Sequence, residues 1–237
     1  MKRPQATLCA ALCLTWLGLP SSARATSGDS GGTPAEPVRP VGGSGNGAGG
    51  LSVADAAFVG RPQRVSGTVG RAAAGATVLV QLSDAASGWR TLATTRAGPD
   101  GSFRTAWSAP RPGRFTLRAV ASAGSRAGAS STQPVLSAPL SVYAPARATI
   151  FGPGFYGRRT ACGTLLRPTT VGVAHRTLPC GTRLEAYYGG RRLVVSVIDR
   201  GPYVAGVSWD LTAAAARALG FPGQGELGTL AVRRPLP

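Results

Sequence analysis

The C-terminal third of this chain holds few side chains that can carry protons, so the chemistry open to it is narrow. From residue 146 onward it has four carboxylates, two of them Asp199 and Asp210, and one histidine, His175. A protonated carboxyl group can act as a general acid, and a nearby histidine can orient or assist it. Asp199 directly follows the apolar run 193–198, which places it at a strand end, where burial favours the protonated form and the neighbouring Arg200 opposes it. General acid–base catalysis is the chemistry that fits this set.

Each of these residues also has a purely structural interpretation. Asp210 could be only the N-cap of the helix expected after it, a role worth about 1 kcal/mol. Asp199, in the sequence Asp-Arg-Gly-Pro, could be a turn residue whose carboxylate binds backbone N–H groups. His175 could be a hydrogen-bonded loop histidine. The sequence leaves both interpretations open for all three residues.

Two of the four cysteines, Cys162 and Cys180, lie in this C-terminal third, and the other two lie in an apolar N-terminal run. An even pair in an exported protein predicts a disulfide, because that compartment is oxidising. Closing a loop of this size stabilises a fold by about 3 kcal/mol in the chain-entropy model. A metal site is the weaker alternative, since one histidine and no CxxC or HxxxH spacing cannot fill a tetrahedral site. We therefore expect no metal and no cofactor.

Residues 1–25 have the features of a secretory signal peptide. Lys2 and Arg3 give a charged start, residues 6–19 are an apolar run, and small residues at 23–25 suit a signal peptidase. The alternative is a retained membrane anchor, which needs about 18 or more apolar residues. We expect cleavage before Thr26, secretion, and no stable membrane anchor after the signal is removed.

The formal net charge of +17 comes almost entirely from arginine, with Lys2 as the single lysine. A GC-rich genome produces such a composition by default, but the surface attracts polyanions whatever its origin. Outside a cell the polyanions are anionic wall polymers, such as teichoic acids and the carboxylates of peptidoglycan. Nucleic acid is not an expected partner, because no helix-turn-helix, zinc-finger or RNP-type aromatic pattern accompanies the charge.

The region before the C-terminal third divides into a linker and a domain. Residues 26–51 are rich in Gly, Ser, Pro and Ala without an apolar period, which predicts a disordered linker. Residues 52–145 alternate apolar and polar residues in short runs between turn signals, which predicts an antiparallel β-sandwich. Strands are expected at 64–69, 76–82, 89–96, 102–107, 114–120 and 140–143. The order and spacing of these runs resemble those of bacterial immunoglobulin-like wall-protein modules, which implies a spacer or adhesion role.

Residues 146–237 change character and are expected to form a second domain, after a short hinge at 145–147. The alanine-rich run 212–219 predicts the one clear helix, capped by Asp210 or Thr212 and ended by Gly220. Strands are predicted at 148–156, 183–188, 191–198 and 227–232, with a glycine hairpin turn at 188–191. The predicted fold class is therefore mainly all-β.

Four stretches of this second domain carry a family resemblance. They read Ala-Thr-Ile-Phe from Ala148 with Thr-Ala-Cys-Gly over 160–163, Val-Ala-His-Arg-Thr-Leu-Pro-Cys-Gly-Thr over 173–182, Val-Ile-Asp-Arg-Gly-Pro-Tyr over 197–203, and Trp-Asp-Leu-Thr-Ala-Ala-Ala over 209–215. Their order, spacing and residue types resemble those of the RlpA-like double-psi β-barrel family, which also contains the expansin-type barrels.

The resemblance implies a six-stranded, pseudo-symmetric barrel whose groove accepts an extended glycan, here peptidoglycan or another wall polysaccharide. In relatives with lytic transglycosylase activity the cleft holds the histidine and aspartate of the two middle motifs, which implies His175 and Asp199 here. Expansin-like relatives loosen polysaccharide without hydrolysing it and emphasise the aspartate that matches Asp210. Glycans also bind aromatic faces close to such a cleft. The residues predicted to contact the glycan are Tyr156, Thr160, Arg200, Tyr203 and Trp209.

One position departs from the family pattern. Many transglycosylase-type members carry a glutamate just after the Thr-Ala-x-Gly glycine, where this chain has Thr164. The leading hypothesis is a secreted, wall-associated protein that binds and cleaves peptidoglycan strands. Asp199 is expected to be the acid and base, His175 to orient or assist it, and Asp210 to hold either the sugar or Asp199. Thr164 favours the alternative of a non-catalytic, expansin-like wall-binding or wall-loosening module. A third hypothesis is a barwin- or protease-inhibitor-like barrel that presents its loops to a protein partner.

Overall fold

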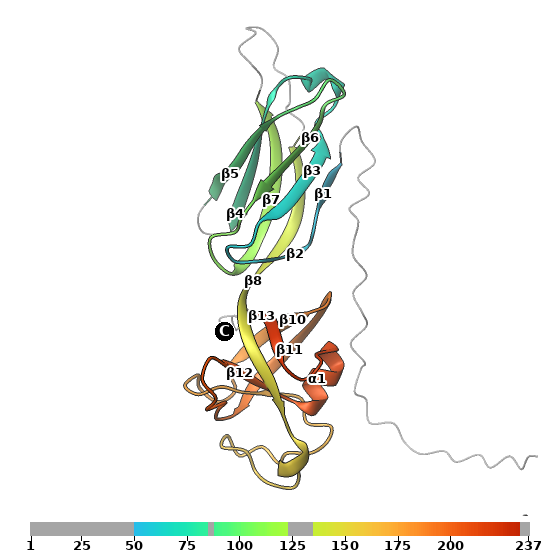
Figure 1. The fold of residues 1–237 in the computed structure, drawn as a ribbon. Helices are drawn as coiled ribbons and strands as arrows, with labels where there is room; N and C mark the ends of the chain where they lie inside the picture. The colour runs from blue at the N-terminus through green and yellow to red at the C-terminus, as the bar shows by residue number, and fades with distance from the viewer. Residues whose placement is uncertain (1–49, 85–87, 123–134, 233–237) are drawn as a thin grey trace, which may run out of the picture. The chain divides into compact units, whose positions relative to one another are not determined.

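The computed structural model describes residues 50–84, 88–122 and 135–232, which form an antiparallel sandwich and then a six-stranded barrel (Figure 1). Most of the regular structure is strand, as the alternating sequence predicts. The expected signal peptide and nearly all of the expected linker lie outside the described residues. The first strand already begins at Leu51, the last residue assigned to that linker.

Two sheets make up the sandwich. One has the order β1-β3-β6, with β1 at Leu51–Val53, β3 at Gln63–Thr68 and β6 at Ser102–Trp107. The other has the order β5-β4-β7-β8, with β4 at Thr77–Asp84, β5 at Gly88–Arg96, β7 at Gly113–Ser122 and β8 at Val135–Phe151. β2 (Ala56–Phe58) pairs in parallel with β8, and a short 3-10 helix, η1, spans Arg71–Ala73.

Alternation along the strands places apolar side chains between the two sheets. In β7 the buried residues are Phe115, Leu117, Ala119 and Ala121, and the residues between them are exposed or half-buried. Burying each large apolar side chain stabilises a fold by about 1.5–3 kcal/mol. The antiparallel sandwich expected from the sequence is therefore present, and its assignment to the immunoglobulin-like class stays a prediction.

β8 is a single strand of 17 residues that belongs to both the sandwich sheet and the barrel. Its first part pairs with β7, and the part from Ala144 to Ala148 pairs with β13. The hinge predicted at 145–147 is therefore wrong. Pro145 indicated a break because it lacks a backbone N–H, but proline can stand in a strand where that donor is not used. Here Pro145 lies opposite Gly228.

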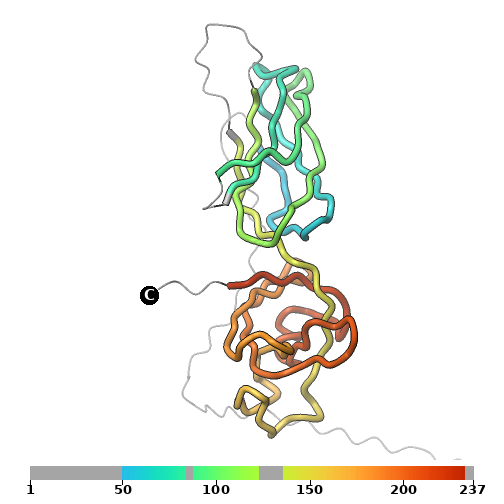
Figure 2. Tube along the Cα trace, turned by 90° about the vertical axis from the view of Figure 1, so that its left-hand side faces the viewer, coloured from blue at the N-terminus to red at the C-terminus, as the bar shows by residue number. Residues whose placement is uncertain are grey.

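The barrel closes on itself through six strands (Figures 1 and 2). They are β8, β9 (Val173–Ala174), β10 (Arg183–Tyr188), β11 (Arg191–Asp199), β12 (Trp209–Thr212) and β13 (Gly225–Ala231). Neighbours pair in the order β8-β12-β9-β11-β10-β13 and back to β8, with β12–β8 and β11–β9 parallel. A short 3-10 helix, η2 (Pro153–Phe155), follows β8. This mixed pairing makes neighbours of residues that lie far apart in the sequence.

One α-helix, α1 (Ala213–Leu219), lies in the described part of the chain and directly follows β12. The Thr212 hydroxyl caps it by accepting the N–H of Ala215, and Gly220 ends it in the left-handed conformation at φ 71°. Of the two N-caps considered, Thr212 is thus the one used, and Asp210 has a different place. Within residues 50–84, 88–122 and 135–232, no helix is long and apolar enough to cross a membrane.

Candidate functional site

His175, Asp199 and Asp210 come together in the barrel, although they belong to three different strands or their ends. Asp199 is the last residue of β11, His175 follows β9, and Asp210 lies in β12. β9 runs between β11 and β12, with Ala174 opposite both Asp199 and Asp210. The backbone N–H of His175 donates to the carbonyl of Asp199 at 3.1 Å. The three predicted residues are therefore neighbours in the fold.

Asp210 is the residue whose surroundings favour a proton. Burial raises the pKa of its carboxyl, the hydrogen bond from Thr149 acts in the opposite direction, and the negative charge of Asp199 raises the pKa again. The Thr149 hydroxyl donates to Asp210 Oδ1 at 2.9 Å, because parallel pairing of β12 with β8 places the two residues opposite each other. Oδ2 is then the oxygen available to carry a proton.

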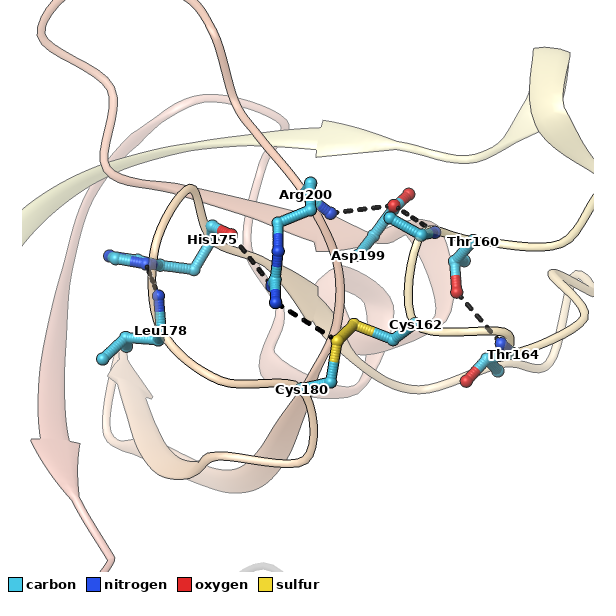
Figure 3. Close-up of a disulfide and its surroundings, with 9 residues drawn as sticks. Thr160, Cys162, Thr164, His175, Leu178, Cys180, Asp199 and Arg200 are labelled. Atoms are coloured by element: carbon cyan, nitrogen blue, oxygen red, sulfur yellow. Dashed lines mark hydrogen bonds between the residues drawn. A yellow bond between two sulfur atoms is a disulfide. The ribbon is translucent and has the colours of Figure 1, made fainter.

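Asp199 is held as a hydrogen-bond acceptor. Its Oδ1 accepts the backbone N–H groups of Ala161 and Arg200, each at 2.8 Å (Figure 3). The structure thus contains the backbone-binding geometry that the sequence Asp-Arg-Gly-Pro suggested, and this geometry fixes the orientation of the carboxylate.

His175 is held by its own loop as a neutral hydrogen-bond donor. Its Nδ1 accepts the backbone N–H of Leu178 at 3.0 Å (Figure 3) and that of Thr177 at 3.2 Å. A ring nitrogen that accepts is unprotonated, so the neutral ring carries its hydrogen on Nε2. Burial lowers the pKa of His175, and the charges of Arg176 and Arg200 lower it further. The imidazole is therefore suited to donate through Nε2 rather than to act as a base.

We expect His175 to be the Nε2–H tautomer at neutral pH and to take up a proton only below its usual pKa of 6.5. Nitrogen-15 NMR reads both properties, and its imidazole signals are unambiguous because the chain has one histidine. Protein unfolded in denaturant is the control and should titrate at the usual value. A folded protein with the hydrogen on Nδ1, or with a midpoint at or above 6.5, would contradict this geometry.

The three aromatic residues predicted to bind glycan have different surroundings. Trp209 is only 8% exposed, and its ring centroid lies 4.5 Å from that of His175. It therefore supports the histidine from the core and does not offer an open face to a sugar. Tyr156 is half-buried, with its hydroxyl beside Gly152. Tyr203 is 80% exposed and presents its ring to solvent.

The predicted disulfide between Cys162 and Cys180 is present and ties together two loops of the site (Figure 3). The first of these loops holds Thr160, whose Oγ1 accepts the N–H of Thr164 at 3.1 Å. The second loop holds Cys180, whose sulfur lies 3.3 Å from Nη2 of Arg200, the residue after β11. The disulfide thus fixes the backbone around the acidic residues, and Thr164 takes part in a local turn.

Two further residues of the site cannot be recognised from the sequence. Thr149 contacts Asp210 across 61 residues of chain, through a strand pairing that no local pattern reveals. Arg176 donates to three backbone carbonyls of the loop at 201–207. The available signal is that each lies inside one of the four family motifs, and Arg176 directly follows His175.

Comparison with known proteins identifies the barrel segment. A family model described as "Lytic transglycolase" matches residues 144–233. A probable endolytic peptidoglycan transglycosylase RlpA from Synechocystis is 46% identical over 80 residues, covering 33% of this chain and 25% of the relative. The Aquifex aeolicus protein of the same name is 46% identical over 76 residues, covering 31% of this chain and 34% of the relative. The similarity thus spans at most 34% of the length of these two relatives.

Among solved structures, the Streptomyces papain inhibitor (SPI) is 25% identical, with a TM-score of 0.30, over 36% of this chain and 91% of that one. The family model matches the segment that closes into the ring of six strands. Residues 144–233 therefore form an RlpA-like double-psi β-barrel domain.

Proposed function

We propose that the barrel binds peptidoglycan glycan strands and cleaves them in the manner of a lytic transglycosylase, with Asp210 moving the proton. The observation that carries this proposal is the pairing of a half-buried Asp210, whose pKa is raised, with the fixed carboxylate of Asp199. Two carboxyl groups in unlike surroundings are the common arrangement for acid catalysis at a glycosidic bond. The names of the relatives, endolytic peptidoglycan transglycosylases, supply the substrate class.

The proposed reaction consumes no water. Asp210 Oδ2 gives its proton to the glycosidic oxygen as the bond from that oxygen to the sugar C1 breaks. The 6-hydroxyl of the same sugar attacks C1, and its proton passes to the Asp210 carboxylate, which restores the acid. One product strand ends in a 1,6-anhydro sugar and the other in a free hydroxyl, so atoms and protons balance.

In this scheme Asp199 and His175 act on the sugar without moving protons. The charge of Asp199 stabilises the positive charge that develops at C1, and it also raises the pKa of Asp210. The Nε2–H of His175 donates to a sugar oxygen. This assignment exchanges the roles first favoured for the two aspartates, because burial acts on Asp210 while backbone N–H groups hold Asp199.

Peptidoglycan sacculi labelled with a dye test both halves of the proposal. The protein should sediment with the sacculi and release soluble dye steadily over time, and heat-unfolded protein is the control. Sedimentation without any release would contradict cleavage. Failure to sediment and to release dye would contradict the assignment to wall glycan altogether.

A non-catalytic wall-binding role is the second candidate. The two backbone hydrogen bonds to Asp199 favour it, since a purely structural carboxylate would make the same contacts. Thr164 favours it as well, because many transglycosylase-type members have a glutamate there. Under this alternative the protein sediments with sacculi, and replacing either Asp199 or Asp210 changes neither binding nor release.

Asp199→Asn tests the coupling between the two aspartates. The charge of Asp199 raises the pKa of Asp210, so removing that charge lowers the pKa. The protonated, active form of Asp210 is then lost at a lower pH than in the wild type. We expect the alkaline limb of the pH–rate profile for dye release to shift toward lower pH. A limb that stays in place or moves upward would argue against Asp210 as the acid.

We also propose that the protein works outside the cytoplasm, at the cell wall. The Cys162–Cys180 disulfide fits an oxidising compartment, and residues 1–25 have the composition of an export signal. The arginine-rich surface would attract anionic wall polymers in addition to the glycan, with an affinity that falls as salt is raised.

A further inference from the structure

A four-residue turn, 203–206, projects from the barrel directly after the Asp-Arg-Gly-Pro motif. Tyr203 is 80% exposed and Val204 is 61% exposed, whereas the flanking Pro202 and Val207 are buried. The N–H of Val207 donates to the carbonyl of Val204 at 3.3 Å, which closes the turn. An exposed aromatic and an exposed apolar side chain thus stand together on a short, closed turn.

Arg176 holds the base of this turn through hydrogen bonds. Its Nε donates to the carbonyl of Pro202, and its Nη2 donates to the carbonyls of Val204 and Val207, the former at 2.9 Å. The guanidinium therefore bonds both flanks of the turn and the turn itself. The planar fork of arginine can make such divergent bonds at once, which the single ammonium of lysine cannot reproduce.

The hydrogen bonds of Arg176 connect the turn to the proposed catalytic groups. Arg176 directly follows His175, and Tyr203 lies four residues after Asp199. Binding normally carries an entropic cost for ordering a loop and its side chains, and a loop that is already held avoids most of that cost. A rigid tyrosine also offers a large flat contact area with few rotatable bonds.

Resting on the proposed function, we infer that Arg176 is a positioning residue that holds Tyr203 as a preformed rim of the glycan site, where the ring stacks on a sugar. The occupant is a neutral sugar face rather than an anionic polymer, because Tyr203 and Val204 carry no charge. Arg176 uses Nε and Nη2 on backbone carbonyls in this arrangement, so it acts through the turn and not on the substrate.

Dissociation constants for peptidoglycan sacculi, measured by sedimentation, test this inference. We expect Tyr203→Ala to weaken binding about tenfold and Arg176→Lys to weaken it about threefold to tenfold. The double variant should bind no more weakly than Tyr203→Ala alone, because Arg176 acts through Tyr203. Arg217→Lys is the matched control, since Arg217 also donates to a backbone carbonyl, that of Pro168, at 2.7 Å. Its affinity should equal that of the wild type.

Additive losses in the double variant, or wild-type affinity in Arg176→Lys, would overturn the inference. Wild-type protein that does not bind sacculi contradicts the proposed function instead. Nitrogen-15 relaxation at Tyr203 and Val204 gives a readout that does not depend on glycan. These amides should be as rigid as strand residues in the wild type and mobile on the nanosecond timescale in Arg176→Lys. A turn that is already mobile in the wild type would remove the basis for a preformed rim, and this measurement also identifies a variant that fails to fold.

Discussion

Asp210→Asn should reduce the release of muropeptides from sacculi by about 10²–10⁴-fold, the range typical for loss of a general acid. The amide retains an oxygen that can accept the hydrogen bond from Thr149, so the local geometry of β12 should persist. The substitution therefore removes the transferable proton and little else. Binding to sacculi should remain close to that of the wild type.

Glu226→Gln is the matched control for this loss. Glu226 is a partly exposed carboxylate on β13 that pairs with Arg61. Its variant should release muropeptides at the wild-type rate. Asp210→Asn that retains full activity would exclude Asp210 as the acid, and equal losses in both variants would indicate a general effect of acidic charge.

Replacing Cys162 and Cys180 together by serine should lower the free energy of unfolding by about 3 kcal/mol, because the open loop gains freedom in the unfolded chain. The cysteines are separated by 18 residues. Thermal unfolding followed by circular dichroism measures the change. The carboxylate of Asp199 should also be held less firmly, because Ala161, whose N–H donates to it, directly precedes Cys162.

Reductant provides the internal control for the disulfide prediction. Dithiothreitol should lower the melting temperature of the wild type to that of the double serine variant and leave the variant unchanged. If reductant has no effect on the wild type, the bond does not form in solution. If the melting temperature of the variant equals that of the oxidised wild type, the bond forms without stabilising the fold.

Local signals predicted some elements of the barrel and missed others. Strands β9 and β12 were not predicted, and the strand expected at 148–156 ends at Phe151, before the 3-10 helix η2. Strands β10 and β11 were expected within one residue of their observed bounds, because Gly189 and Gly190 mark the turn between them with positive φ. The helix was expected because an alanine-rich run lies between a capping residue, Thr212, and Gly220. Each of these features depends on residues a few positions apart, which is the range that sequence patterns describe.

Other features of the site depend on strand pairing between residues far apart in the sequence, which local signals do not reveal. The N-cap interpretation of Asp210 was excluded only by the structure, which gives that role to Thr212, while the parallel pairing of β12 with β8 places Asp210 opposite Thr149. Trp209 looked like a glycan platform, yet the same strand turns its ring into the core against His175. Pro145 was misinterpreted as a hinge because its partner in β13 is remote in sequence.

The products formed from sacculi in ¹⁸O-labelled water, analysed by mass spectrometry, test the central claim most directly. If Asp210 protonates the leaving oxygen while the sugar's own 6-hydroxyl attacks, the muropeptides end in 1,6-anhydro sugars that contain no ¹⁸O, and Asp210→Asn yields none of them. Reducing ends that carry ¹⁸O would show hydrolysis instead. Protein that sediments with the sacculi and yields no soluble product would show that the barrel binds the wall without cleaving it.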